Sequence, residues 1–265
     1  MNTENLQAIL QPVGVSAVRY FESIGSTNDE ALQWAGQGAP DFALVTADTQ
    51  SSGRGRMGRK WVSTAGACLA FSLVLRPTPP ETNCITLFSP LGALAIQRVL
   101  QNNYRLPCEV KWPNDVLIYR KKVAGILVEI DWNGAIPEGI IQGIGVNISQ
   151  AAVPPASDLL FPATSLEDEL GYRPDRWEFL RQVLAQIKAL RPLLPTGALI
   201  KEWEKHLAFA GERIRVESTV QPPQIGRLIG LGQDGSLLLQ SDQEEIISIA
   251  AGDVHAHHLR PLGEE

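Results

Sequence analysis

Apolar residues recur along this chain with two different periods, and the change between them divides the chain into two regions. Up to about residue 195, stretches with helical spacing alternate with continuous apolar runs of strand length. Between Leu194 and Gly211 this pattern gives way to short apolar runs, two of which are separated by Asp234-Gly235, a dipeptide that favours tight hairpins. We therefore predict a domain of helices and strands over residues 1–208 and a small all-β domain over residues 209–265.

Three stretches of the larger region have the spacing of amphipathic helices. The first begins at Ser26-Thr27-Asn28-Asp29-Glu30, where two overlapping pairs of residues have capping-box spacing, and it ends near Gly36. Asp175 precedes the last helix, and Pro192 ends it. The residues that face a core in the middle and last helices are Leu87, Leu91, Leu94, Ala95, Leu100, Phe179, Val183, Ile187 and Leu190.

Continuous apolar runs predict the strands. In the larger region these runs cover residues 42–47, 68–75, 116–119, 123–130 and 140–148. Arg120-Lys121-Lys122 separates the third run from the fourth, as in a hairpin with a short basic connection. In the smaller region the runs fall at residues 214–216, 225–229, 237–239 and 246–249, which together predict a small barrel. A barrel of about 55 residues is too small to be stable by itself, so we expect it to dock on the larger domain.

Composition restricts the class of protein. In a chain of 265 residues, 44% hydrophobic and 20% charged residues are typical of a globular protein with a sizeable core. The formal net charge of −6 argues against nucleic-acid binding. No apolar run approaches the ~20 residues of a membrane span, and the N-terminus lacks a signal-peptide pattern. We therefore expect a cytoplasmic protein that has neither nucleic acid nor membrane as a partner.

Cysteine and histidine give little sign of a metal site. The three cysteines are odd in number and lie in or beside apolar segments, which predicts buried free thiols at Cys68, Cys84 and Cys108. Three histidines crowd together near the C-terminus, at His255, His257 and His258. Because no cysteine lies near them, we favour a solvated segment over a metal site there.

The segment Gly53-Arg54-Gly55-Arg56-Met57-Gly58-Arg59-Lys60-Trp61 concentrates cations and glycines in an otherwise acidic chain. Glycines allow the backbone to approach a ligand closely, and arginines offer rigid, charged forks to phosphate or carboxylate. The three glycines also fit a dinucleotide-binding fingerprint, but no helical period follows and the next run has no acidic residue for a ribose. The pattern therefore favours a loop that binds a phosphorylated small molecule, with a solvated basic loop as the plainer alternative.

Three further segments place polar side chains at the ends of predicted strands. Lys111-Trp112-Pro113-Asn114-Asp115 presents a cation, an amide and a carboxylate within five residues. Lys122 opens an apolar strand in which Gly125 leaves room for the close approach of another group. Gly143-Ile144-Gly145-Val146-Asn147 ends another strand with an amide. A turn, a solvated lysine and a β-bulge are the plainer interpretations, and each segment taken alone leaves both open.

Taken together, the order and spacing of these motifs closely resemble the catalytic core of the biotin protein ligases. The matching motifs are Ser-Thr-Asn, the glycine-arginine segment, Lys-Trp-Pro-Asn-Asp, Lys-x-x-Gly-Ile-Leu and Gly-x-Asn, and the resemblance spans roughly residues 20 to 260. It implies an α+β fold, in which a mixed-sheet catalytic domain of the biotin/lipoate ligase type carries a small C-terminal SH3-like β-barrel.

The resemblance also implies roles for individual residues. It assigns catalysis to Lys122, Arg54 and Asp115, and it makes Asp115 a ligand of Mg²⁺. It assigns biotin contacts to Ser26, Thr27, Asn28, Gln50, Gly53, Arg54, Gly55, Arg56, Lys122 and Gly125. It assigns contacts with ATP or the adenylate to Arg54, Arg56, Arg59, Trp61, Lys111, Asn114, Asp115, Lys122 and Asn147, and it places Phe161 near the adenine.

The activity that the resemblance implies is ATP-dependent biotin ligation. Biotin would be converted to biotinoyl-5′-AMP with release of pyrophosphate and then transferred to a lysine of a biotin carboxyl carrier protein, with Mg²⁺ as cofactor. Two alternatives remain, a lipoate or octanoate ligase of related architecture and a biotin sensor without transfer activity. Ser26 lies too near the N-terminus for the DNA-binding domain of some family members, so we expect no operator binding. Pairing into a homodimer occurs in the family, and the sequence leaves it open here.

Overall fold

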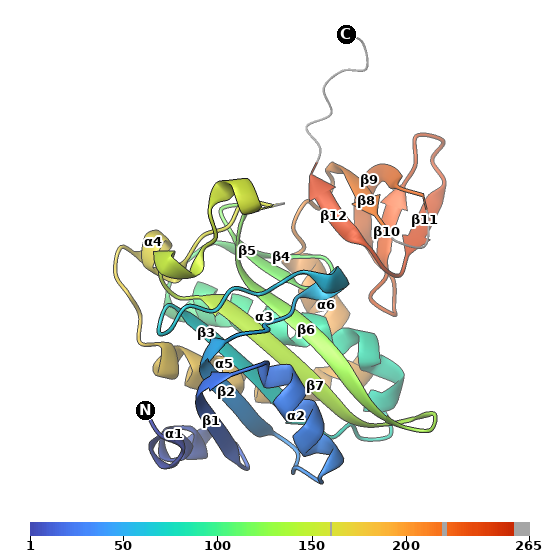
Figure 1. Cartoon of the computed structure of the whole chain (residues 1–265). Helices are drawn as coiled ribbons and strands as arrows, with labels where there is room; N and C mark the ends of the chain where they lie inside the picture. Colours follow the sequence, from blue (N-terminus) through green and yellow to red (C-terminus); the bar gives the residue numbers. More distant parts are fainter. Residues whose placement is uncertain (160, 219–221, 257–265) are drawn as a thin grey trace.

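A computed structural model describes residues 1–159, 161–218 and 222–256 of the chain. Within these residues, a seven-stranded sheet organises the larger part (Figure 1). Its strands β1 and β2 run parallel and all other neighbours run antiparallel, so the predicted mixed sheet is confirmed. In spatial order the strands are β1 (Val18–Ile24), β2 (Ala43–Gln50), β3 (Cys68–Leu75), β7 (Ile136–Asn147), β6 (Lys121–Asn133), β5 (Asp115–Ile118) and β4 (Cys108–Lys111).

Helices cover both faces of this sheet because its strands alternate buried side chains between two hydrophobic clusters. One face packs against α3 and α5, and the other packs against α2 (Figure 1). The α-helices are α1 (Thr3–Leu10), α2 (Thr27–Gly36), α3 (Phe88–Asn103), α4 (Leu166–Leu170), α5 (Arg176–Leu190) and α6 (Ala198–Lys205). Short 3₁₀ turns are η1 (Gln11–Val13), η2 (Arg56–Gly58), η3 (Glu81–Leu87), η4 (Gln150–Ala152), η5 (Ala156–Asp158) and η6 (Arg191–Thr196).

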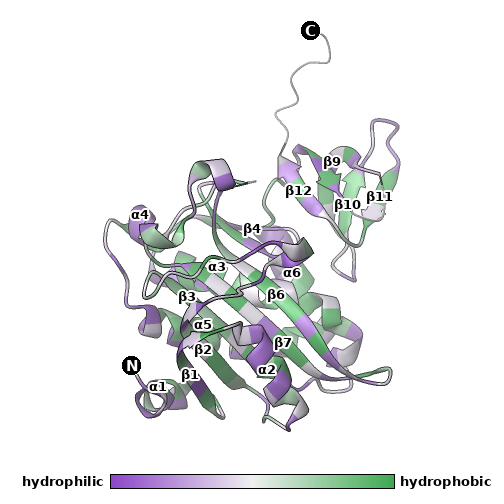
Figure 2. Ribbon diagram, in the orientation of Figure 1, coloured by the Kyte–Doolittle hydropathy of each residue, from purple (hydrophilic) through white to green (hydrophobic). Residues whose placement is uncertain are grey.

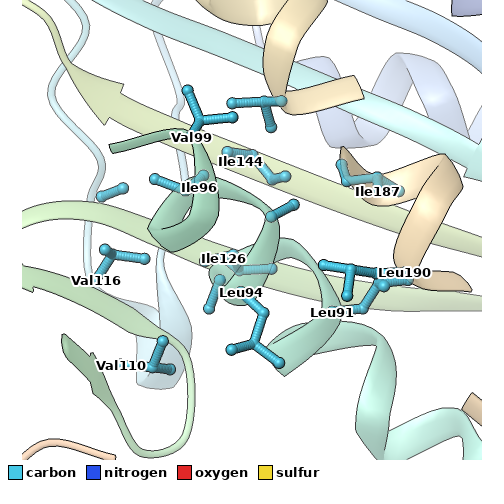
Figure 3. Close-up of a cluster of buried hydrophobic side chains, with 14 of the residues drawn as sticks. Leu91, Leu94, Ile96, Val99, Val110, Val116, Ile126, Ile144, Ile187 and Leu190 are labelled. Atoms are coloured by element: carbon cyan, nitrogen blue, oxygen red, sulfur yellow. The ribbon is translucent and has the colours of Figure 1, made fainter. Parts of the chain in front are cut away.

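The main core lies between the sheet and α3. Figure 3 shows side chains of α3 lying against those of the central strands and of α5; the labelled residues there include Leu91, Leu94, Ile96, Val99, Ile126, Ile144, Ile187 and Leu190. Figure 2 shows the same division by hydropathy, with hydrophobic residues along β6 and hydrophilic residues on the outer side of α2. Burial of α3 on nearly every side up to Leu100 explains why most of its sequence to that point is apolar.

The helical segment formed by η3 and α3 corrects one expectation. Residues Glu81–Asn103 are long and apolar enough to cross a membrane by length and composition, whereas the sequence was expected to hold no such run. In the structure, 67% of the most apolar window of this segment is buried inside the protein. The hydrophobicity is therefore accounted for by the core that α3 builds with the sheet and α5.

A partly buried arginine joins η6, η3 and the loops that flank β2 and β3. Arg191, at the start of η6, donates from Nε to Glu81 Oε1 at 2.7 Å and from Nη1 to both carboxylate oxygens of Asp41 at 2.8 and 2.9 Å. Its Nη2 donates to the carbonyl oxygen of Arg76 at 2.6 Å. Burial alone would raise the pKa of Glu81, but the hydrogen bonds from Arg191 and Thr78 hold that pKa below its usual value. We call these contacts the Arg191 clip.

The smaller part of the chain is a five-stranded antiparallel sheet, which fits the predicted SH3-like domain. In spatial order its strands are β11 (Ile246–Ile249), β10 (Leu237–Gln240), β9 (Gln224–Leu231), β8 (Arg213–Glu217) and β12 (Asp253–Ala256). It docks on the larger part, because Trp112 Nε1 donates to the carbonyl oxygen of Gly235 at 3.0 Å and Thr86 Oγ1 donates to that of Asp234 at 2.8 Å. The division between residues 208 and 209 stays a prediction.

Predictions of helix caps and turns from the sequence were confirmed at some positions and were wrong at others. Asp175 caps α5 by accepting from the backbone N–H groups of Trp177 and Glu178, as predicted. Ser26 occupies the N-cap position of α2, but its side chain makes no capping hydrogen bond. The hairpin between β5 and β6 turns at Tyr119 and Arg120, both of which have positive φ. The predicted connection was therefore placed too late, and Lys122 lies within β6.

Candidate active site

A cavity of about 410 Å³ opens on the face of the sheet that α2 covers. Its walls come from the start of α2, the end of β2, the strands β5, β6 and β7, the glycine-arginine segment and β12. Of the residues assigned to the site from the sequence, only Gly53 is absent from this lining. The structure brings together Ser26, Thr27, Asn28, Gln50, Arg54, Gly55, Arg56, Arg59, Trp61, Lys111, Asn114, Asp115, Lys122, Gly125, Asn147 and Phe161.

One end of the cavity carries a network of neutral polar groups, which we call the floor network. Gln50 Oε1 accepts from the backbone N–H of Thr27 at 2.8 Å and from Thr27 Oγ1 at 3.1 Å. Ser72 Oγ, fully buried on β3, lies 2.8 Å from Thr27 Oγ1 and 2.6 Å from Asn28 Oδ1. The Ser72 hydroxyl has one proton and can donate it to only one of these two oxygens at a time. Ser72 therefore links the two α2 residues and leaves part of their hydrogen-bonding capacity free for a ligand.

Asn28 belongs to the floor network more than to the cavity. Its amide is almost fully buried, and Nδ2 donates to Glu129 Oε2 at 2.7 Å and to the Leu127 carbonyl oxygen at 3.4 Å. A Cβ on Gly143 would lie 2.0 Å from Asn28 Oδ1, so only glycine lets this amide lie against β7. The glycine leaves room for a side chain of the protein itself.

The same relation holds between Trp61 and two other glycines. A Cβ on Gly145 would lie 2.3 Å from Trp61 Cε2, because the indole ring lies directly on β7. A Cβ on Gly53 would lie 2.5 Å from the carbonyl oxygen of Trp61, and the Trp61 backbone N–H donates to the Gly53 carbonyl oxygen at 2.9 Å. Gly53 therefore closes the base of the segment. We call residues 53–61 the arginine loop.

The other end of the cavity carries a carboxylate between two lysines. Asp115 is buried, with Oδ1 2.7 Å from Lys122 Nζ and Oδ2 3.6 Å from Lys111 Nζ. Burial alone would raise the pKa of Asp115, but the charges of Lys122 and Lys111 reverse this and hold the pKa below its usual value. Burial lowers the pKa of Lys111, whose Nζ lies 4.9 Å from the centre of the Phe161 ring. The cluster is a fixed array of charges.

Backbone contacts fix the residues around this cluster. The Lys122 backbone N–H donates to the Pro162 carbonyl oxygen at 2.7 Å, and the Lys122 carbonyl oxygen accepts from Thr164 at 2.9 Å. Asn114 Nδ2 donates to the Ile126 carbonyl oxygen at 2.8 Å, and Asn147 Nδ2 donates to that of Thr164 at 3.0 Å. Both amides therefore hold strand ends in place, and both residues line the cavity.

The three arginines of the arginine loop all contact acceptors of the protein. Arg54 pairs with Asp29 and, at 2.8 Å, with Glu129. Arg56 Nη1 lies 3.3 Å from Asn114 Oδ1, 3.3 Å from the Gly252 carbonyl oxygen and 3.4 Å from Asp253 Oδ1, and burial lowers the pKa of Arg56. Arg59 also pairs with Asp253. The loop thus spans from α2 and β6 to β12, and the predicted contacts of these arginines with a ligand remain predictions.

Several residues of the site were missed from the sequence. Ser72 is a polar position inside the apolar run of β3, which was a readable signal. No such signal marked Asp29, Glu129 or Asp253, because each of them contacts residues that are distant along the chain. His255 lines the cavity 3.6 Å from Glu217, whereas His257 and His258 lie outside the described residues. Within the part of the chain that the structure describes, no group of three or more His, Cys, Asp or Glu side chains could hold a metal ion.

The dinucleotide interpretation of the three glycines does not fit the structure. In that fold the glycines open a helix directly after a strand. Here the loop contains one short turn, η2, and then leads as extended chain toward β3. The glycines instead permit contacts of the loop with itself and with Trp61.

Comparison with known proteins gives consistent matches. Residues 20–147 match the model of the biotin/lipoate A/B protein ligase family. The chain is 34% identical over 240 residues to the bifunctional ligase/repressor BirA of Bacillus spizizenii, covering 89% of this chain and 72% of that protein. It is 36% identical over 228 residues to the biotin–[acetyl-CoA-carboxylase] ligase of Paracoccus denitrificans, covering 81% of this chain and 90% of that one. Among solved structures, a biotin protein ligase from Aquifex aeolicus in complex with biotin and ATP superimposes with a TM-score of 0.78 at 28% identity, covering 91% and 98% of the two chains.

Proposed function

Because the chain belongs to the biotin/lipoate A/B protein ligase family, we propose that it is the enzyme that activates biotin with ATP and transfers it to a protein lysine. The observation that carries this proposal is the composition of one cavity. A neutral hydrogen-bonding network lies at one part of it, and a cluster of cations around Asp115 lies at another. Biotin has the matching polarity, with a neutral ureido group at one end and a carboxylate at the other.

The floor network suits the ureido end of biotin. Thr27 and Gln50 offer donors and acceptors that are already ordered, and the Ser26 hydroxyl has no capping hydrogen bond to give up. The strand segment from Gly125 to Leu127 supplies the apolar wall beside it. Groups held in place before the ligand arrives lose little entropy on binding, which favours affinity.

In the first half-reaction, an oxygen of the biotin carboxylate attacks the α-phosphorus of ATP. The bond from this phosphorus to the bridging oxygen breaks, and pyrophosphate leaves with the electron pair. Two negative groups must approach each other, so fixed positive charge is required where charge develops. Lys122, oriented by Asp115, and Arg54 supply it in this proposal.

We propose Asp115 as the protein ligand of a magnesium ion that is shared with nucleotide phosphates. Mg²⁺ usually takes one or two protein carboxylates, completing its shell with waters and phosphate oxygens. Asp115 is an ionised carboxylate in the cavity wall, and the described residues offer no larger ligand group. Asp115 would hold the ion, which would neutralise charge on the phosphates.

In the second half-reaction, an uncharged lysine amine of the acceptor attacks the acyl carbon of biotinoyl-5′-AMP. The bond between the acyl carbon and the phosphate oxygen breaks, AMP leaves, and the amine gives its proton to solvent. The arginine loop, held to β12 through Arg56 and Arg59, covers the cavity and excludes water that would hydrolyse the adenylate. We propose a biotin carboxyl carrier domain as the acceptor.

Exchange of labelled pyrophosphate into ATP tests the proposal, with biotin, lipoate and octanoate compared in parallel. Exchange that depends on biotin alone is expected. Exchange with lipoate or octanoate instead would assign the chain to the neighbouring activity of the family, and binding of biotin without any exchange would favour the sensor. Incubation with a carrier domain, followed by mass spectrometry of its lysine, tests the transfer step.

Three further properties are proposed. Cytoplasmic location follows from the composition and is tested by cell fractionation. Pairing into a homodimer is tested by light scattering at several concentrations. Absence of nucleic-acid binding, expected from the formal net charge of −6, is tested by a mobility-shift assay with and without biotin and ATP.

A further inference from the structure

A buried serine in the floor network has a fixed direction of hydrogen-bond donation. Asn28 Nδ2 lies 2.7 Å from Glu129 Oε2 and 3.4 Å from the Leu127 carbonyl oxygen. A carbonyl oxygen and a carboxylate that pairs with an arginine only accept hydrogen bonds, so the amide presents its NH₂ group to them and its oxygen to Ser72. Because Asn28 Oδ1 carries no proton, its contact of 2.6 Å with Ser72 Oγ requires the Ser72 hydroxyl to donate.

This direction of donation determines the state of the Thr27 hydroxyl. Ser72 Oγ and Thr27 Oγ1 lie 2.8 Å apart, and the single proton of Ser72 is already used, so Thr27 supplies the proton of that contact. A second acceptor for the same proton is Gln50 Oε1 at 3.1 Å, which also accepts the Thr27 backbone N–H at 2.8 Å. Both acceptors belong to the protein. The proton of Thr27 is therefore directed away from a ligand, and the lone pairs of Oγ1 remain available.

Burial keeps this arrangement from reversing. Ser72 and the Asn28 amide are both buried, so water does not take over their hydrogen bonds. Turning the Ser72 proton toward Thr27 would leave two oxygens without a proton between them at 2.6 Å, and a buried acceptor without a donor is costly. Thr27 lines the cavity, whereas Ser72 is not among the described residues that do. The polarity of the cavity wall at Thr27 is thus set from β3, by a side chain behind that wall.

We propose that Ser72 is a positioning residue that holds the Thr27 hydroxyl as an acceptor toward the cavity, so that the site selects a ligand with an N–H group at that point. The ureido group of biotin carries two N–H groups, whereas the dithiolane end of lipoate and the methyl end of octanoate carry none. A site that leaves a buried polar group unpaired with the wrong ligand rejects that ligand. This inference rests on the proposed function, because it takes biotin as the ligand of the floor network.

Analogues of biotin in which oxygen replaces one ureido N–H test the polarity of Thr27. Two such cyclic carbamates exist, one for each nitrogen, and both are titrated beside biotin by calorimetry with the full chain and without ATP. In the unaltered protein, one of them should bind about 10²-fold more weakly than biotin, because its ring oxygen and Thr27 Oγ1 are then two acceptors facing each other. The ratio of its Kd to that of biotin is the measured quantity.

Ser72→Ala should lower this ratio to less than about tenfold. Without the contact at 2.8 Å, the Thr27 hydroxyl can turn its proton toward the carbamate oxygen. Comparing two ligands in two proteins isolates this interaction from a general loss of affinity. Ser72→Thr keeps a hydroxyl and should retain the high ratio. Ser72→Cys replaces it by a weak donor and weak acceptor, so it should lower the ratio, and it serves if the alanine variant does not fold.

Thr46→Val is the matched control. Thr46, on β2, is as fully buried as Ser72, and its Oγ1 donates to the Ala70 carbonyl oxygen at 2.8 Å, away from the floor network. Valine keeps the volume of the side chain and removes the hydroxyl. The variant therefore reports what the loss of a buried hydroxyl does to the sheet in general, and its ratio of Kd values should stay near 10².

Three results would overturn the inference. The first is a ratio in Ser72→Ala equal to that of the unaltered protein, and the second is equal affinity of the unaltered protein for biotin and both carbamates. The third is an equal fall of the ratio in Thr46→Val, which would assign the effect to a loosened sheet. Failure of the proposed function looks different, because the unaltered protein would then show no biotin-dependent pyrophosphate exchange, whatever the ratios of the Kd values.

Discussion

Replacement of Lys122 by methionine tests the electrostatic core of the site. Methionine retains most of the side-chain volume and removes the charge, so the perturbation falls on Asp115 and on the ligand. Removal of one group aimed at developing transition-state charge costs about 2.7–4 kcal/mol, or 10²–10³ in kcat. Lys111 remains within 3.6 Å of the same carboxylate, so we expect the lower end, a loss of about 10²-fold.

The change also has a cost for folding. Asp115 Oδ1 loses its partner at 2.7 Å, while the carboxylate stays buried beside Lys111. Loss of a hydrogen bond to a charged group costs about 1.5–3 kcal/mol, and we expect the lower part of this range because the Lys122 side chain is 26% exposed. Thermal unfolding of the variant shows whether a folded protein is being assayed.

Lys121→Met is the matched control for this experiment. Lys121 is the preceding residue of β6, but its side chain is 44% exposed and pairs with Glu169 at 2.7 Å outside the cavity. Biotin-dependent pyrophosphate exchange should be unchanged in Lys121→Met and should fall about 10²-fold in Lys122→Met. Calorimetric titration with biotin alone should give similar affinities for both. If the exchange rate of Lys122→Met lies within about threefold of the rate of the unaltered enzyme, the electrostatic role assigned to Lys122 is refuted.

Three further predictions address other parts of the structure. Glu81→Gln removes a charge from the Arg191 clip and should lower the free energy of unfolding by about 1.5–3 kcal/mol at pH 7. The folded-state pKa of Glu81 is depressed, so the stabilisation from its charge is present above the unfolded pKa of about 4.3 and is lost as pH falls. Urea unfolding of the unaltered protein and of Glu81→Gln should therefore show a smaller difference in the free energy of unfolding at pH 3.5 than at pH 7. Equal differences at the two pH values would contradict this. Gly145→Ala places a Cβ 2.3 Å from Trp61 Cε2 and should destabilise the protein by about 1–3 kcal/mol and weaken biotin-dependent exchange, whereas unchanged values would mean that the ring is free to move. Arg56→Gly removes contacts of the loop with Asn114 and β12 and should release the adenylate, so that bystander proteins become biotinylated; a clean blot of bystander lysines would count against retention by the loop.

The sequence predicted elements well where local and tertiary preferences agree. The apolar run at Cys68–Leu75 is a strand whose bounds match the prediction, because every residue in it is buried. The capping of α5 by Asp175 is a local hydrogen bond, and it is present. β1 was missed because it is an edge strand of mixed polarity, and the hairpin at Tyr119 was misplaced because neither turn residue is the glycine or asparagine that usually marks positive φ.

The sequence predicted which residues belong to the site more completely than it predicted which of them contact one another. Nearly all of the residues assigned from the motifs line the cavity, since each motif is contiguous along the chain, whereas other lining residues such as Ala152, Pro154 and Asp253 belong to no motif. Which groups touch within it depends on strand register, which a single sequence does not contain. The two glycines of β7 show this dependence. The space beside Gly143 is filled by Asn28, and the space beside Gly145 is filled by Trp61, so both hold side chains of the protein itself. Glu129 could not be found at all, since its partners lie about 75 and 101 residues away in sequence.

The pairing of β3 with β7 determines when this cavity can exist during synthesis. The two strands pair from Cys68 with Asn147 to Leu75 with Ile140; β7 lines the cavity, and β3 supplies Ser72 to the floor network. A ribosome adds roughly 5–20 residues per second, so several seconds separate the emergence of β3 from that of its partner. During that interval a strand that is apolar except for Ser72 has one unpaired edge, which is the kind of surface that aggregates or binds chaperones. The strand that supplies Ser72 to the finished site is therefore also a part of the nascent chain that needs protection until β7 emerges.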